Sequence, residues 1–140
     1  MSPAGPHPRT LTVARIVGAL LVLAAGGIHL FLVLTGAGGL LGVTFVLNFI
    51  AGLVLGVGML VAPRRFLLAV TVLALLFMVA SLVALALALT LTVGLLGVQP
   101  GWDYPLIRET AIIESIGVVV LVAATVIAWR DRRAGLTPRR

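Results

Sequence analysis

Charge and cysteine are both scarce in this sequence. Cysteine and lysine are absent, and charged residues make up 10% of the 140 residues, against about 25% in soluble domains. Without cysteine the chain has no disulfide, thiolate metal ligand or cysteine nucleophile. Hydrophobic residues make up 61%, and the mean hydropathy is +1.27. A soluble domain of this length could not bury so much apolar surface, so lipid is the solvent for most of the chain.

Two long stretches contain no charged residue, Ile16–Ala62 and Phe66–Trp102. Each is too long for one membrane span, and breaks at Gly36–Gly39, Pro63–Arg65 and Gln99–Gly101 divide the chain further. Four membrane-spanning helices are therefore expected, at about 11–34, 40–61, 66–93 and 104–129. Residues 1–10 and 130–140 are expected to form a disordered and a basic tail. The predicted fold class is all-α, a polytopic membrane protein with an antiparallel four-helix transmembrane bundle.

The arginines predict how the helices are oriented. All but one of the ten fall on one side of the predicted bundle: Arg9, Arg15, Arg64, Arg65, Arg130, Arg132, Arg133, Arg139 and Arg140. By the positive-inside rule this side is cytoplasmic, which places both termini in the cytoplasm. Arginine without lysine is typical of high-GC coding, so we expect a bacterial plasma membrane protein. Because the arginines flank apolar spans, they indicate membrane topology and not a nucleic-acid partner.

Small residues occur at helical spacing on two of the expected spans. Gly52 and Gly56 form a GxxxG pair on the second, and Ala80, Ala84 and Ala88 form a stripe on the third. Such patterns let helix backbones approach closely in lipid. Two interpretations stay open: packing within one chain, or the interface of a homo-oligomer.

Polar residues inside the apolar spans are the candidates for function, because they are costly in hydrocarbon. His29, Asn48 and Glu114 lie on three different helices, all roughly 9–15 Å below the outer boundary at 1.5 Å per residue. Thr44, Thr110 and Glu109 are expected toward the mouth of this cluster, and Arg108 near the outer interface. Arg108 and Glu109 could instead be interfacial charges that point outward. These seven residues are the predicted ligand or proton site. Asp103 is expected to cap the fourth helix.

The chemistry of this cluster stays open at this stage. A carboxyl group within the membrane must be protonated or paired, so Glu114 could pair with His29, bind a proton, cation or polar ligand, or contact a lipid headgroup. His29 could hydrogen-bond to Glu114 or to Asn48. One histidine and one carboxylate are too few for a metal site, and no cofactor is predicted. Ser81 and Ser115 have no base at any visible spacing, so no catalytic residue is assigned.

Short motifs in all four spans resemble a group of uncharacterised small four-helix integral membrane proteins of high-GC bacteria. The matching segments are Gly26–Leu30, Phe45–Asn48, Thr92–Gly97, Ile113–Glu114 and Gly117–Leu121. The chain is similar to DoxX-like proteins in size and helix count only. The resemblance implies the fold and carries no activity.

Three functions follow as hypotheses. The first is a non-catalytic membrane protein that binds a partner, lipid or small ligand in an outward-facing polar crevice, as an accessory subunit or binding protein. The second is a proton-coupled transporter or carrier that uses Glu114 and His29. The third is a membrane redox protein or other enzyme. The partners expected are the lipid bilayer and either another membrane protein or a second copy of the chain.

Overall fold

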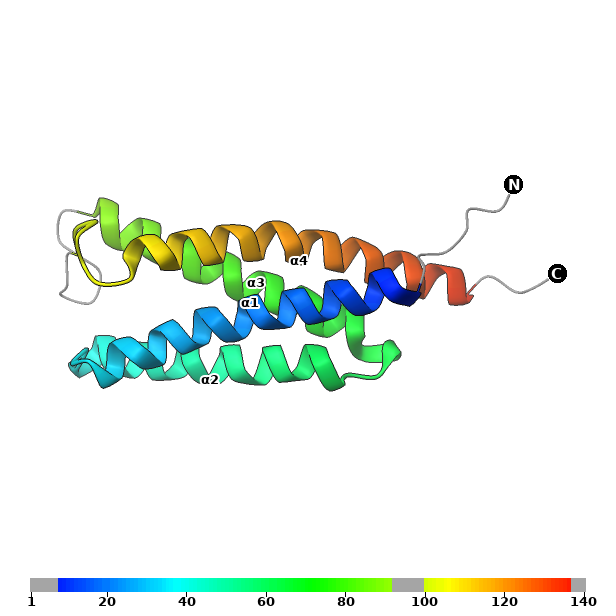
Figure 1. Ribbon diagram of the computed structural model, residues 1–140, viewed down its shortest axis with the longest axis horizontal. Helices are drawn as coiled ribbons and strands as arrows, with labels where there is room; N and C mark the ends of the chain where they lie inside the picture. Colours follow the sequence, from blue (N-terminus) through cyan, green and yellow to red (C-terminus); the bar gives the residue numbers. More distant parts are fainter. Residues whose placement is uncertain (1–7, 92–99, 137–140) are drawn as a thin grey trace.

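Four long helices make up almost all of the protein that the computed structural model describes, residues 8–91 and 100–136. They are α1 (Pro8–Leu34), α2 (Gly39–Val61), α3 (Arg64–Thr90) and α4 (Ile107–Leu136). Each contains a stretch long and apolar enough to cross a membrane. They run up, down, up and down, so that α1 begins and α4 ends at the same end of the bundle (Figure 1). The predicted fold class, an all-α transmembrane bundle, is confirmed.

Helix boundaries differ from the expected ones mainly at the two ends of the chain. α1 begins at Pro8, so residues 8–10 are helical, and proline is favoured in the first turn of a helix. α4 begins at Ile107, directly after Leu106, whose φ of 63° lies outside the helical region. α4 then continues through residues 130–136, part of the expected basic tail. Residues 1–7, 92–93 and 137–140 of the predicted tails and third span lie outside the described residues, as does the Thr92–Gly97 motif.

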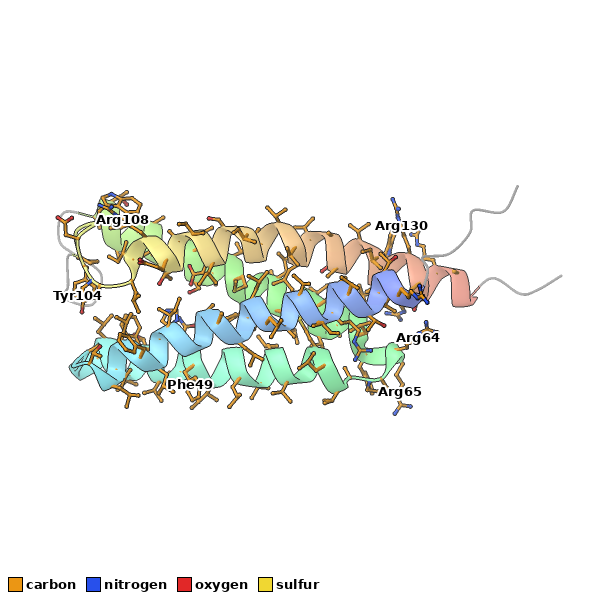
Figure 2. All side chains as sticks on the ribbon, viewed as in Figure 1. Phe49, Arg64, Arg65, Tyr104, Arg108 and Arg130 are labelled. Atoms are coloured by element: carbon orange, nitrogen blue, oxygen red, sulfur yellow. The ribbon has the colours of Figure 1, made fainter. Side chains whose placement is uncertain are left out.

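The two ends of the bundle differ in charge. Arg64, Arg65 and Arg130 lie at one end, here called the arginine end (Figure 2). The opposite end, here called the Tyr104 end, carries the turn between α1 and α2, Tyr104 and Arg108. The helices therefore separate the charges as the sequence predicts.

The closest helix contact joins α1 to α2 and depends on glycine. A Cβ atom added at Gly52 would lie 3.0 Å from the Cα atom of Gly26 and 3.1 Å from the carbonyl oxygen of Val22. One turn further on, a Cβ atom at Gly56 would lie 2.6 Å from the side chain of Leu23. The GxxxG pair therefore packs within the chain. A homo-oligomer that uses another surface stays a prediction.

The buried face of α3 differs from the alanine stripe expected on this helix. Ala80 and Ala84 are exposed and Ala88 is half-buried. The buried positions on α3 are instead Leu67, Thr71, Ala74, Met78 and Ser81. Their alternating spacing of three and four residues is that of helices packed at a small crossing angle. Ser81 thus belongs to the face that packs against the rest of the bundle.

Arg15 ties α1 to the end of α2. Its Nε atom donates a hydrogen bond to the Met59 carbonyl, and Nη2 donates to the carbonyls of Leu60 and Ala62, each at 2.9 Å. The last carbonyls of a helix have no partner within it and carry partial negative charge. The guanidinium group therefore caps the end of α2.

Loss of this cap should be measurable. Arg15→Met keeps most of the aliphatic length but removes the donors, so we expect the free energy of unfolding to fall by about 1.5–3 kcal/mol. Titration of the detergent-solubilised protein with a denaturing detergent measures this change. Arg9→Met, at an exposed position of the same helix, is the control and should change stability little. Equal losses in both variants would contradict the capping role.

Candidate functional site

A cavity of about 260 Å³ lies inside the bundle near the Tyr104 end. All four helices and the segment before α4 contribute to its wall, and most of the contributing side chains are apolar. The lining residues are His29 and Leu32 of α1, Leu41, Thr44, Phe45 and Asn48 of α2, Ser81, Ala84, Leu85 and Ala88 of α3, Pro100, Tyr104 and Pro105, and Ile107, Thr110 and Glu114 of α4. The volume lies close to the lower limit of roughly 300–1,000 Å³ for ligand pockets.

The packing of the helices accounts for the position of this cavity. At the Tyr104 end, α1 lies close to α2, whereas α3 and α4 lie further from α1 (Figure 1). Toward the arginine end the interior is filled by fully buried apolar side chains. These are Ala19, Val22, Ala25, Met59, Ala74, Met78 and Leu121. The cavity is thus confined to one half of the bundle.

Glu114 is completely buried, with 0% of its surface exposed. The Ser81 hydroxyl donates a hydrogen bond to Glu114 Oε1. Glu114 Oε2 is buried and has no hydrogen-bond partner among the described residues. Since Glu114 lines the cavity, a molecule in the cavity could supply the missing partner.

His29 and Asn48 form a second polar pair across the α1–α2 contact. His29 Nδ1 lies 2.8 Å from the Ala25 carbonyl oxygen, and Nε2 lies 3.1 Å from Asn48 Nδ2. The imidazole ring also meets the Phe45 ring edge-on, with centroids 5.1 Å apart. The structure therefore joins His29 to Asn48, one of the two partners considered for it. Among the described residues no ion pair joins His29 to Glu114.

The two threonines of the predicted site line the cavity but donate their hydroxyl protons to backbone carbonyls three or four residues earlier in the chain. Thr44 donates to the Leu41 carbonyl at 2.7 Å, and Thr110 donates to the Leu106 carbonyl at 2.6 Å. Their oxygen atoms keep lone pairs that can accept hydrogen bonds. Leu106, the acceptor for Thr110, has a left-handed φ of 63°, which costs a non-glycine residue about 1–2 kcal/mol. The hydrogen bond from Thr110 helps to offset this cost at the start of α4.

Two residues of the predicted site, Arg108 and Glu109, do not line the cavity. Both are exposed, and the Arg108 Nη2 atom lies 3.9 Å from Asp103 Oδ1. Asp103 also does not cap the fourth helix, which begins at Ile107, but pairs with Arg108. The expectation that placed them near the mouth followed their depth in the membrane, which does not determine the side of the helix.

Ser81 belongs to the site although it is not among the residues predicted for it. The sequence shows no base at a spacing that would make it a nucleophile. The available signal was its position in the series Leu67, Thr71, Ala74, Met78 and Ser81, which places it on the buried face of α3. Which carboxyl group it meets depends on how α3 packs against α4.

Comparisons with known proteins give no further information on this site. No protein family, characterised protein or solved structure matches the chain. The resemblance to small four-helix proteins of high-GC bacteria therefore stays a prediction. Within residues 8–91 and 100–136, no three His, Asp or Glu side chains gather in a group that could hold a metal ion.

Proposed function

We propose that this chain is a non-catalytic protein of the bacterial plasma membrane that binds a small ligand in its cavity. With both termini in the cytoplasm, the Tyr104 end faces outward and the ligand enters from that side. The observation that carries the proposal is Glu114 Oε2, a fully buried polar atom without a partner in a mostly apolar cavity. Cavities of this composition, with a few convergent polar groups, are typical of ligand sites.

A carrier that uses Glu114 and His29 receives less support. The two side chains have separate partners, Ser81 and Asn48. A fully buried apolar layer lies between the cavity and the arginine end, so polar groups do not continue across the bundle in this conformation. Binding needs only the conformation that is described, whereas transport would require a second one.

A small neutral probe with a compact hydrocarbon cage, adamantanol, tests the proposal. The protein is placed in nanodiscs of zwitterionic lipid, and binding of the tritiated probe is corrected with empty nanodiscs. Ala88→Phe places a large ring in the cavity wall, and Ala86→Phe is the matched control because Ala86 does not line the cavity. We expect saturable binding that Ala88→Phe reduces at least about tenfold, since the ring occupies the volume of the probe, and that Ala86→Phe leaves unchanged. Equal binding to both variants would contradict the proposal.

A further inference from the structure

Among the described residues, the wall of the cavity contains one carboxyl group, that of Glu114, and no arginine. The ion pairs between Arg64 and Asp131 and between Arg108 and Asp103 both lie outside the cavity. Glu114 therefore depends on Ser81 for its hydrogen bond and has no cationic partner in the wall.

His29 does not supply the missing positive charge. A carbonyl oxygen can only accept a hydrogen bond, so the contact with Ala25 places the ring proton on Nδ1. The Asn48 amide nitrogen faces Nε2 and donates to it, which leaves Nε2 without a proton. With Nδ1 donating and Nε2 accepting, the imidazole is neutral and both of its nitrogens are used.

We propose that the ligand is a lipophilic amine whose ammonium group binds Glu114 Oε2 while its hydrocarbon part fills the apolar remainder of the cavity. This inference rests on the proposed function, because it names the class of ligand for the same cavity. An ammonium group provides both the donor that Oε2 lacks and the charge that the wall lacks, and hydrogen bonds between ions are the strong ones. The apolar wall, which includes Leu32, Leu41 and Leu85, selects a hydrocarbon body over a polar one.

A ligand with a negative charge is disfavoured by the same arrangement of side chains. A ligand carboxylate would place a second negative charge beside Glu114, with no cation in the wall to separate the two. A neutral alcohol would satisfy the hydrogen bond of Oε2 but brings no charge to pair with a carboxylate, so Glu114 would have to remain protonated. The order of affinity is therefore amine first, alcohol second and carboxylate last.

Three probes with one hydrocarbon cage test this order: adamantanamine, adamantanol and adamantane carboxylate. Their binding is measured on the full chain in nanodiscs of zwitterionic lipid, which carry no surface charge to concentrate the amine. We expect the amine to bind at least about tenfold more tightly than the alcohol, because hydrogen bonds to charged groups are the stronger ones. Glu114→Gln should bring the amine to the affinity of the alcohol, and Ala88→Phe should weaken both.

The outcomes separate this inference from the proposed function. If amine and alcohol bind equally and Ala88→Phe weakens both, the amine preference is overturned and the binding function stands. If Ala88→Phe weakens none of the probes, both are overturned. Because the comparison of the three probes on the native chain is decisive by itself, the inference stays falsifiable even if Glu114→Gln fails to fold.

Discussion

Replacement of Gly52 by leucine (Gly52→Leu) is expected to force α1 and α2 apart and to lower the free energy of unfolding by about 3 kcal/mol or more. Even a Cβ atom at this position would lie 3.0 Å from the Gly26 Cα atom and 3.1 Å from the Val22 carbonyl oxygen. Both are backbone atoms, so no side-chain rotation can relieve the contact. Unfolding in mixed micelles, followed by circular dichroism, measures the loss.

Gly58→Ala, on the same helix, provides the control for the loss of a glycine. A Cβ atom at Gly58 would lie 3.5 Å from a Val70 side-chain atom, an ordinary contact. Alanine is the better helix former by about 1 kcal/mol, so Gly58→Ala should leave stability unchanged or raise it slightly. Wild-type stability in Gly52→Leu would show that α1 and α2 do not depend on this close approach.

Removal of the buried carboxyl group is expected to stabilise the fold. Glu114→Met keeps a side chain of similar length and removes an oxygen atom that is buried without a partner, which typically costs about 1–3 kcal/mol. Ser81 loses its acceptor, but a helical serine can donate instead to a carbonyl one turn earlier. We therefore expect the free energy of unfolding to rise by about 1–3 kcal/mol, measured by the same mixed-micelle titration.

Glu109→Met is the control that shows whether the expected gain in stability arises because Glu114 is buried. Glu109 lies on the same helix but is exposed, so its replacement should change stability by no more than about 0.5 kcal/mol. A loss of stability in Glu114→Met would mean that the hydrogen bond to Ser81 outweighs the unpartnered oxygen. Glu114 would then be a structural tie between α3 and α4. A gain would show instead that the chain retains a destabilising carboxyl group in its cavity, as binding sites often do.

The distribution of charge by itself determined the architecture. Stretches without charge, broken by Gly36–Gly39 and Pro63–Arg65, defined four helices because a charged side chain is costly at membrane depth. Their boundaries were less certain, since a helix can extend beyond the apolar stretch, as α4 does through residues 130–136. Depth along the helices also placed His29, Asn48 and Glu114 at a similar level, and all three line the cavity.

The tertiary structure alone decided which side chains meet. Depth in the membrane is fixed by position along one helix, but contact depends on the rotation of each helix about its axis and on its neighbours. For this reason Arg108 and Glu109, at a suitable depth, lie outside the cavity, while Ser81 lies in its wall. The same packing pairs His29 with Asn48 and Glu114 with Ser81 through hydrogen bonds. The sequence thus placed the carboxyl group within the membrane, and the packing of α3 against α4 left one of its oxygens without a partner.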